Sequence, residues 1–545
     1  MSKPLRAALV GAAIAALATL PGLGVGTLWD NSETAYGEVA REILLTGDWI
    51  VMHSNGHPWF VQPPLYFWIA AIFAKLFGVT SFALRLPSAL ATIAMGGMTG
   101  YAVARQRGTR AGIYAGVILS TCLMQAIMGR LAIMDALLDL AVSLSIFWWF
   151  RALETGRDRY AVYGWIAAGF GFLAKGPVAP VAALLVIVPY YLWNRRMERT
   201  YAWSPRAWIA GLAGFVLIVA PWLVLLGMRT GLGSIVTLIG HYTIGRYTGV
   251  IENQAGPIWY YIPVVILGFF PWIAFLPVAA AFAVQRLRAN SVDANLARLL
   301  RLAVVWAVVP FLFFSFARTK LPNYIALEFP AFALLLALYF DDVARRGSSR
   351  AATISAGAVP VTVALVAIGV ALFARDNRLT NDTLALVPDL LVMGGAIVAG
   401  SILTTVMLAL RRGSTFGLYA LAAAMLVAVD VLAIFAVPQT ERFKPIPKLA
   451  AVIDRLRRPG DAVAIEHLAG GNALLFYTAP PVYALSPHDG NGAHHVAPRS
   501  IICTARRVFV VAPAGPLPTY GREVRFITRA GKAALVLYHG PACTS

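Results

Sequence analysis

The chain has 545 residues, of which 59% are hydrophobic and only 13% are charged. The charged share is about half of the ~25% found in soluble domains, so this composition excludes a water-soluble, disordered, coiled-coil or fibrous protein. The formal net charge is +20, from 45 basic and 25 acidic residues. Much of the positive charge lies in short loops between apolar runs, which indicates membrane topology rather than a nucleic-acid partner. The sequence therefore predicts a polytopic all-α membrane protein.

The N-terminal segment carries Lys3 and Arg6 ahead of an apolar stretch that runs to about Leu28. A cleaved signal peptide is the alternative interpretation. The stretch is too long for the apolar region of a signal peptide, and no convincing small-residue cleavage site precedes Asp30. We therefore expect a first membrane span with its basic end in the cytoplasm.

Thirteen spans are predicted, most of them as long as the ~17–25 residues that cross hydrocarbon. They cover residues 7–28, 82–104, 111–130, 136–153, 161–175, 178–194, 207–228, 258–283, 299–317, 324–340, 351–373, 384–410 and 415–437. The apolar stretch 64–79 is instead assigned to the outer interface, because a span there would place the Arg-rich loop 105–110 outside, against the positive-inside rule. The N-terminus is then inside and the C-terminus outside. Residues 1–438 form the predicted transmembrane domain.

Residues 439–545 are predicted to form a small α/β domain outside the cytoplasm. Its expected elements are apolar runs at 462–465, 473–477, 507–511 and 534–538, with a helix over 447–457. Cys503 and Cys543 both lie in this domain, and two cysteines in an oxidising compartment can pair; two free buried thiols are the alternative. The histidines lack the cysteine or carboxylate spacing of a metal site and are assigned to surface loops. They are His488, His494 and His495.

The first outer loop is predicted to contain an amphipathic interfacial helix over 33–46, because its apolar residues recur at helical spacing. Ser32 or Asn31 is the expected cap. Asp30 and Glu33 flank this cap at the positive end of the helix, which favours ionised carboxylates. A capped surface helix is the plain alternative; the position beside the membrane favours a functional role. The repeating apolar residues are Tyr36, Val39, Ala40 and Ile43.

Further polar residues lie at the outer ends of other predicted helices. Asp135 opens the fourth span, and a carboxylate at membrane depth is costly enough to suggest a function. Carboxylates together with basic residues at one interface suit a site that binds an anionic headgroup and deprotonates an alcohol. Snorkelling of Lys and Arg at helix ends can explain any one of the basic residues, but it explains their clustering less well. The other residues are Lys175, Lys320, Tyr324 and, in a long loop over 229–257, His241, Arg246, Tyr247 and Glu252.

These segments resemble the GT-C glycosyltransferases. The run SETAYGEVAREILLTGDWIVMHSNGHPWFVQPPLYFW, followed by FGVTSFALRLPSAL, is similar to the first outer loop of the protein O-mannosyltransferase superfamily, in the branch of the lipid A aminoarabinose transferases. MDALLD at 134–139, AKGP at 174–177, WYYIPVVILGFFPW at 259–272 and ARTKLPNY at 317–324 resemble further family segments in the same order. The resemblance covers residues up to about 340, and the later helices and outer domain fit the same architecture.

The resemblance implies the GT-C fold and inverting transfer of a sugar from a polyprenyl-phosphate carrier. Transfer to a lipid A-like or other envelope acceptor would occur at the periplasmic face of the bacterial inner membrane. The partners are thus the lipid-linked donor, the acceptor and membrane lipids, and no sugar nucleotide or other cofactor is implied. The expected catalytic carboxylates are Glu33, Asp135 and Asp30, with the first two ranked ahead of the third. The expected phosphate-binding residues are Lys175, Lys320, Arg246, Tyr324 and Gln62.

The chain departs from the family pattern at four positions. Ser32 stands where the family carries the Asp of an Asp-Glu pair, and Ala35 replaces an arginine. Gln62 replaces the lysine expected to bind the lipid phosphate, so Lys175 and Lys320, with Arg246 as a third candidate, are predicted to supply that charge. Val61 stands where some relatives carry a metal-binding Glu, so no metal is predicted.

Two other functional classes are compatible with a basic polytopic chain. A lipid-linked sugar transporter or flippase would usually show paired halves and charged or broken helices near the bilayer midplane. The sequence has no evident internal repeat, and its polar residues lie at helix ends. A non-catalytic lipid-binding membrane protein is the second alternative.

Overall fold

The computed structural model describes the chain apart from a set of short segments. These are residues 1, 31, 198–201, 252–253, 290–292, 348–349, 376–385, 411–413, 469–471, 487–493, 516–518, 521, 531 and 541–545. The chain forms two compact units. The first comprises residues 1–23, 61–66 and 87–436, and the second comprises 24–60, 67–86 and 437–545.

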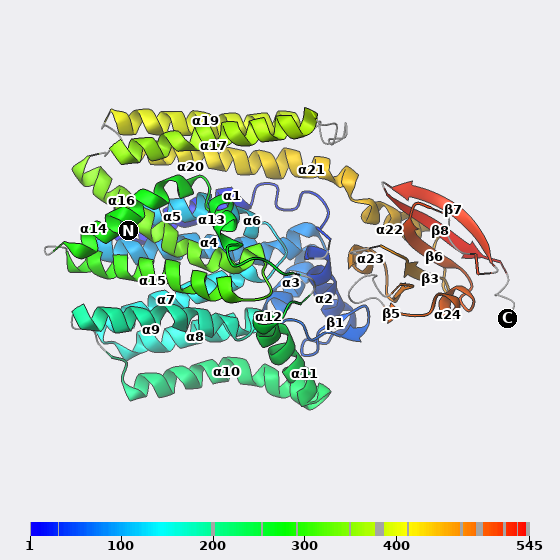
Figure 1. The fold of residues 1–545 in the computed structure, drawn as a ribbon. Coiled ribbons are helices and arrows are strands. Elements are labelled where there is room, and N and C mark those ends of the chain that lie inside the picture. Colours follow the sequence, from blue (N-terminus) through cyan, green and yellow to red (C-terminus); the bar gives the residue numbers. More distant parts are fainter. Residues whose placement is uncertain are drawn as a thin grey trace. The chain divides into compact units, whose positions relative to one another are not determined.

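The regular elements described in the first unit are helices, joined by turns and loops (Figure 1). Its helices are α1 (Lys3–Thr19), α4 (Ser81–Arg107, whose first residues belong to the second unit), α5 (Thr109–Thr121), α6 (Leu123–Met128), α7 (Asp135–Thr155), α8 (Asp158–Lys175), α9 (Val178–Met197), α10 (Pro205–Thr230), α11 (Leu232–Val236), η1 (Thr237–Gly245), α12 (Arg246–Thr248), α13 (Tyr261–Gly268), η2 (Trp272–Phe275), α14 (Leu276–Arg288), α15 (Ala294–Phe316), η3 (Pro322–Glu328), α16 (Phe329–Arg346), α17 (Arg350–Arg375), α19 (Val387–Ala409), α20 (Ser414–Val431) and η4 (Leu432–Ala436).

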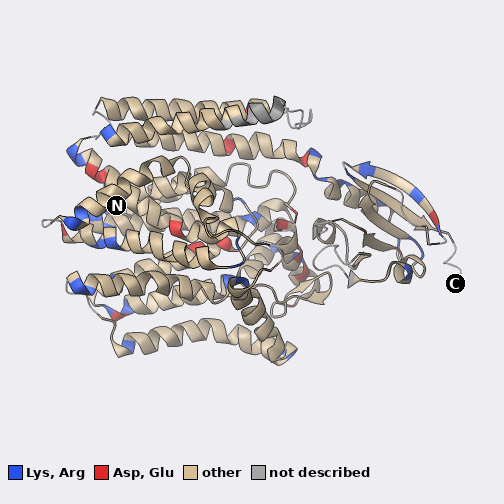
Figure 2. Cartoon of the chain, in the orientation of Figure 1, with Lys and Arg blue, Asp and Glu red and all other residues tan. Residues whose placement is uncertain are grey.

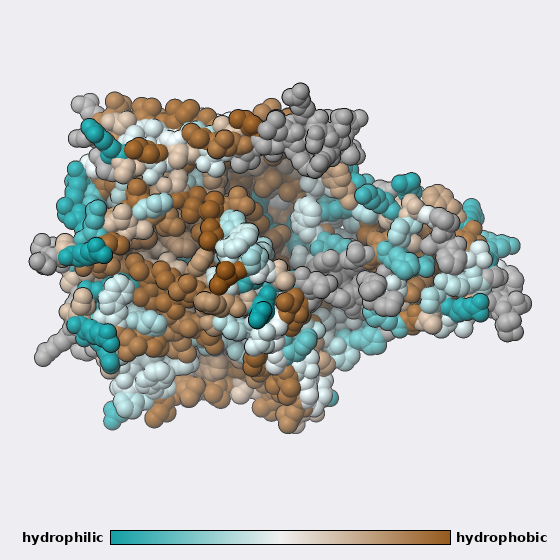
Figure 3. Space-filling view, in the orientation of Figure 1, coloured by the Kyte–Doolittle hydropathy of each residue, from teal (hydrophilic) through white to brown (hydrophobic). Residues whose placement is uncertain are grey.

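Within the described residues, seven helices are long and apolar enough to cross a membrane, or eight if a bent pair counts as one span. The bent pair is Tyr261–Gly268 with Trp272–Arg288, which meet at 106°. Brown, apolar residues cover much of the surface of the helical bundle in Figure 3. The chain is therefore a multi-pass membrane protein. Helical segments lie in each of the thirteen predicted ranges, but the count of thirteen spans stays a prediction.

Small residues let the long helices approach closely, as is common between membrane helices. Helices α7, α8, α9 and α10 run side by side (Figure 1). A Cβ atom at Gly164 of α8 would lie 2.3 Å from the ring of Trp149 in α7. One at Gly211 of α10 would lie 2.2 Å from the ring of Trp165 in α8. Glycine is thus required where these tryptophans pack between helices.

Lys and Arg residues, coloured blue in Figure 2, gather at the left-hand end of the helical bundle. Several are held there by carboxylates: Arg110 and Arg345 each lie 2.9 Å from Asp341. Arg286 lies 2.9 Å from Asp342. Basic residues of the described helices thus gather at one end of the bundle, and the side of the membrane that this end faces stays a prediction.

The predicted loop 229–257 is largely helical, which corrects the sequence interpretation. Helix α11, the π-helix η1 and helix α12 follow one another from Leu232 to Thr248. The apolar residues of this segment have no clear helical repeat of 3.6, because a π-helix has a wider turn with i→i+5 hydrogen bonds. Glu252, which was expected in this loop, lies outside the described residues.

The second unit combines the first outer loop with a C-terminal α/β sheet. Its elements are α2 (Glu33–Thr46), β1 (His53–Ser54), β2 (His57–Pro58), most of α3 (Leu65–Phe77), α21 (Val437–Gln439), η5 (Thr440–Phe443), α22 (Pro445–Leu456), β3 (Ala462–Ile465), α23 (Asn472–Tyr477), β4 (Val482–Ala484), β5 (His494–His495), α24 (Pro498–Ile502), β6 (Val508–Pro513), β7 (Glu523–Ala530) and β8 (Ala533–His539). Helices α2 and α3 lie in the two ranges where interfacial helices are expected, and their position at the membrane interface stays a prediction.

The sheet has the strand order β5-β4-β3-β6-β8-β7. Strands β3 to β6 pair in parallel, and β8 pairs antiparallel with β6 and β7. Helices α22 and α23 cover one face through a core that includes Leu449, Ile453 and Leu474. The run 473–477, expected among the strands, is helix α23; a short apolar run does not distinguish a buried strand from a buried helix.

The cysteine prediction is answered in part. Cys503 is in a disulfide, whereas Cys122 is a buried free thiol. Cys543, the expected partner, lies outside the described residues. That this domain faces an oxidising compartment stays a prediction.

Arg41 of α2 ties the first outer loop to the C-terminal sheet within the second unit. Its guanidinium donates hydrogen bonds to the carbonyl oxygens of Leu475, Phe476 and Thr478, at 2.9–3.1 Å. The turn of the β1–β2 hairpin adds a second link, because Asn55 exchanges two hydrogen bonds of 2.8 and 2.9 Å with the backbone of Val482. Neither residue stood out in the sequence.

Candidate active site

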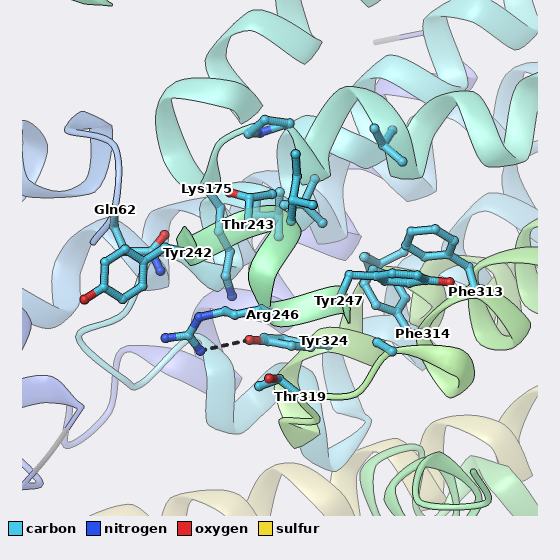
Figure 4. Close-up of a pocket in the computed structure, with 17 residues that line it drawn as sticks. Gln62, Lys175, Tyr242, Thr243, Arg246, Tyr247, Phe313, Phe314, Thr319 and Tyr324 are labelled. Atoms are coloured by element: carbon cyan, nitrogen blue, oxygen red, sulfur yellow. Dashed lines mark hydrogen bonds between the residues drawn. The ribbon is translucent and has the colours of Figure 1, made fainter. Parts of the chain in front are cut away.

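A cavity of about 290 Å³ lies within the first unit, at the junction of η1, α8, α9, α15 and η3. Figure 4 shows the side chains that surround it. Four of the five residues predicted to bind phosphate line this cavity together: Gln62, Lys175, Arg246 and Tyr324. The remaining lining residues are Leu138, Pro177, Val178, Val181, Tyr242, Thr243, Ile244, Tyr247, Phe313, Phe314, Ala317, Thr319 and Leu327.

Arg246 is the first residue of α12, directly after the π-helix. It donates a 3.2 Å hydrogen bond to the Tyr324 hydroxyl, drawn as a dashed line in Figure 4, and a 3.4 Å one to Oε1 of Gln254. The backbone around Arg246 is fixed as well, because its carbonyl accepts a 3.0 Å bond from Thr319 N–H. The following segment continues this pairing, with Lys320 N–H bonded to the Gln254 carbonyl at 2.8 Å. The guanidinium is therefore held at the cavity wall.

Lys175 closes helix α8, where a cation interacts favourably with the negative end of the helix. Its ammonium forms an ion pair with Asp135, the first residue of α7, and lies 4.9 Å from the centre of the Tyr324 ring. Asn323 donates a 2.7 Å hydrogen bond to the same Asp135 oxygen. Asp135 is 3% exposed. This carboxylate therefore orders the ammonium of Lys175 beside the cavity and is itself shielded from solvent.

Lys320 is placed differently from the expectation. Its side chain is 4% exposed and is not among the residues that line the cavity. The ammonium donates to the carbonyl oxygens of Ser315 at 2.8 Å and of Ala317. Burial, together with the neighbouring Arg318, lowers the pKa of Lys320. These contacts give Lys320 a role in holding the turn between α15 and η3.

Several cavity residues carried no signal in the sequence. Tyr242 and Thr243 come from the π-helix, and Phe313 and Phe314 come from a span where aromatic residues are ordinary. Thr319 belongs to the ARTKLPNY segment, so the family resemblance could have indicated it. It accepts a 3.0 Å bond from Ile251 N–H and donates a 2.8 Å bond to the Gly249 carbonyl.

Glu33 and Asp30 belong to the second unit and differ sharply in exposure. Both oxygens of Glu33 accept 2.8 Å bonds from Arg85, and one also accepts a 2.9 Å bond from Trp29 N–H. Glu33 is fully buried. Asp30 is exposed and accepts bonds from Ala473 N–H at 2.9 Å and from the Thr34 hydroxyl at 3.3 Å.

The helix cap of α2 also differs from the expectation. Ser32 is the cap residue but forms no side-chain cap hydrogen bond, and Asn31 lies outside the described residues. Glu33 reaches back to the Trp29 backbone instead. Of the three histidines assigned to surface loops, His488 lies outside the described residues, whereas His494 and His495 form strand β5.

Comparison with known proteins agrees with this architecture. A family model described as dolichyl-phosphate-mannose-protein mannosyltransferase matches residues 61–225. The crystal structure of ArnT from Cupriavidus metallidurans bound to undecaprenyl phosphate superimposes with a TM-score of 0.81, at 21% identity and over 97% of both chains. The predicted resemblance to the protein O-mannosyltransferase superfamily is confirmed. The chain has the GT-C fold with a small C-terminal α/β region, as predicted.

Sequence relatives point to one branch of this superfamily. The undecaprenyl phosphate-alpha-4-amino-4-deoxy-L-arabinose arabinosyl transferase of Aeromonas salmonicida is 31% identical over 339 residues, 60% of this chain and 59% of that relative. A relative of the same name from Pseudomonas fluorescens is 27% identical over 471 residues, 85% of this chain and 82% of its own length. In its matches to the relatives from Aeromonas salmonicida, Erwinia tasmaniensis and Proteus mirabilis, the chain spans 59%, 61% and 65% of their length.

Proposed function

We propose that this chain is an inverting glycosyltransferase that moves a sugar from a polyprenyl-phosphate carrier to a lipid A-like acceptor. The reaction would take place at the periplasmic face of the bacterial inner membrane. The observation that carries the proposal is the cavity in which Arg246, Lys175 and Tyr324 converge. The similarity to aminoarabinose transferases supports the same donor class.

The cavity suits the phosphate of a lipid-linked donor. Arg246 offers a planar fork of donors that matches phosphate oxygens, and Lys175 adds a point charge. Tyr324 contacts both cations, since its hydroxyl accepts from Arg246 and its ring faces Lys175. The remaining wall is largely apolar, which suits the prenyl chain next to the phosphate. Bound phosphate would thus meet two cations beside a hydrocarbon surface.

In the proposed reaction an acceptor oxygen attacks the anomeric carbon of the sugar from the face opposite the phosphate. The bond between the anomeric carbon and the phosphate oxygen breaks, and its electron pair leaves with the lipid phosphate. Arg246 and Lys175 stabilise the charge that develops on this leaving group, which is usually a large part of enzymatic catalysis. The acceptor loses a proton to a carboxylate, a step worth ~10²–10⁴-fold in rate.

The contacts suggest separate roles for the three candidate carboxylates. Asp135 is engaged by Lys175 and Asn323, so we assign it to positioning the phosphate-binding lysine. Glu33 is buried against Arg85, so we assign it to holding the first outer loop. Asp30 is exposed and can receive a proton from a substrate. By its exposure alone Asp30 is our candidate for the general base, although the family resemblance ranks it behind the other two.

The test is the structure of the envelope glycolipids with and without this chain. Lipid A from cells that carry the gene should contain a species heavier by one aminoarabinose, which deletion removes and the Arg246→Ala variant does not restore. A flippase would instead change the amount of lipid-linked donor on the outer face of the membrane. A lipid-binding protein would change neither the mass of lipid A nor the masses of other envelope glycans. Identical lipid A and glycan masses in both strains would contradict the proposal.

A further inference from the structure

A second cavity, of about 70 Å³, lies at the basic end of the first unit, between α4, α7 and α15. Arg105 and Gln106 come from α4, Arg151 comes from α7, and Leu299 comes from α15. The other lining residues are Met98, Tyr101, Ala102, Leu144, Phe147, Trp148 and Phe150. None of them lines the larger cavity.

The two arginines at this cavity are partnered by tyrosines. Arg105 donates a 3.1 Å hydrogen bond to the Tyr101 hydroxyl and lies 5.8 Å from the centre of that ring. Arg151 lies 5.1 Å from the centre of the Tyr160 ring. A guanidinium stacked on a tyrosine keeps its full charge, so its preference for an anion remains.

One carboxylate stands near this cavity. Glu154 accepts a hydrogen bond from Gln106 and interacts electrostatically with Arg298 and Arg151. Two arginines therefore interact with this acid, and Arg105 adds a third positive charge at the cavity. Arg105 is exposed, and Tyr101, Leu144 and Trp148 are half-buried, so the cavity opens onto the outer surface of the bundle.

We propose that this cavity binds the phosphate of an anionic phospholipid headgroup, with the first part of an acyl chain against the apolar residues. At the ends of membrane helices, the anionic groups that a basic pocket meets in the bilayer are the phosphates of lipid headgroups. Basic pockets between helices on the cytoplasmic side are known to take such headgroups. The wall formed by Met98, Leu144 and Trp148 supplies the hydrocarbon contact. This site is separate from the proposed donor site.

The experiment is native mass spectrometry of the full chain, delipidated in a non-ionic detergent and titrated with dioleoyl phosphatidylglycerol or dioleoyl phosphatidylcholine. We expect retained phosphatidylglycerol in preference to phosphatidylcholine. Each of Arg105→Gln and Arg151→Gln should weaken binding about fivefold, and both together about 25-fold. The matched control is the double variant Arg195→Gln, Arg196→Gln, which removes two charges from the end of α9 and should change binding less than about twofold.

Two further measurements test whether the lipid occupies this cavity and whether its acyl chains are needed for binding. Ala102→Phe fills the cavity without changing the charge and should also weaken phosphatidylglycerol binding, while melting temperature reports whether the variant folds. Glycerol phosphate at the same concentration should not displace the lipid. The proposal is overturned if both phospholipids bind equally, if the two double variants behave alike, or if glycerol phosphate competes.

Discussion

Arg246 and Tyr324 are 78 positions apart in the chain, yet the guanidinium of one donates a 3.2 Å hydrogen bond to the hydroxyl of the other. Both side chains line the larger cavity (Figure 4). The backbone pairing of Arg246 with Thr319 brings the two segments together. The phosphate site proposed here is thus fixed by the contact between the π-helical segment and the turn before η3.

Gln62 offers a test by gain of function. It lines the cavity with Lys175 and Arg246, and it stands where the resemblance leads us to expect a lysine. Gln62→Lys adds a third cation and should lower the donor KM about tenfold, because hydrogen bonds to charged groups contribute roughly 1.5–3 kcal/mol. Donor titrations at saturating acceptor measure this change. An unchanged or raised KM would mean that the donor phosphate does not lie beside residue 62.

Asp135 and Lys175 should behave as one unit. Asp135→Asn leaves the half-buried Lys175 ammonium without its carboxylate, and Lys175→Gln leaves the buried Asp135 carboxylate without its cation. Breaking a buried ion pair by removing one partner costs about 3–5 kcal/mol. We expect each single variant to lower kcat/KM at least about 100-fold. The double variant should be no less active than the less active of the two single variants. Asp158→Asn, which changes an exposed acid at the other end of α8, is the control. Additive losses in the double variant would show independent roles.

Substitutions at Asp30 and Glu33 should have different effects, the first on the rate of transfer and the second on the stability of the fold. Asp30→Asn removes the proposed base and should lower kcat about 10²–10⁴-fold with an unchanged melting temperature. Glu33→Gln leaves Arg85 buried without its carboxylate, which should destabilise the protein by about 3–5 kcal/mol. Thermal unfolding in detergent and single-turnover rates measure the two effects. Full activity in Asp30→Asn would exclude it as the base.

The shifted pKa of Glu38 should make the stability of the folded chain depend on pH. Burial raises the pKa of this carboxyl to about 8, although Arg41 opposes the shift. The folded chain therefore holds this proton more tightly than the unfolded chain, whose Glu titrates near pH 4.3, so its contribution to stability is lost as pH rises between these values. We expect the melting temperature of the native protein, relative to Glu38→Gln, to fall between pH 5 and pH 8. A constant difference over that range would contradict the shifted pKa.

The sequence predicted the helices and four polar residues that line the cavity, because apolar length and family segments report them directly. Asp135, Lys175, Arg246 and Tyr324 lie at helix ends, where a polar residue stands out against apolar neighbours. The environment of Lys320 could not be predicted, since its bonds to the Ser315 and Ala317 carbonyl oxygens depend on how the turn closes. The burial of Glu33 was missed for a similar reason: its partner Arg85 lies 52 positions away.

The contacts of the first outer loop with distant parts of the chain could not be predicted from the sequence either. Helix α2 was predicted from its apolar spacing, but its attachment to α23 through Arg41 was not. An arginine that bonds carbonyl oxygens more than 400 positions away leaves no local pattern. The π-helix η1 was missed because its period differs from that of an α-helix.

The most direct test of the proposed function is a transfer assay with the purified chain in nanodiscs, supplied with undecaprenyl phosphate-linked aminoarabinose and lipid A. Mass spectrometry would follow both the modified lipid A and the released undecaprenyl phosphate. We predict equal amounts of the two products from the native protein, and at least about 100-fold less from Arg246→Ala, since an oxyanion contact of this kind contributes ~2.7–4 kcal/mol. Absence of both products with the native protein, or native rates with Arg246→Ala, would contradict the account.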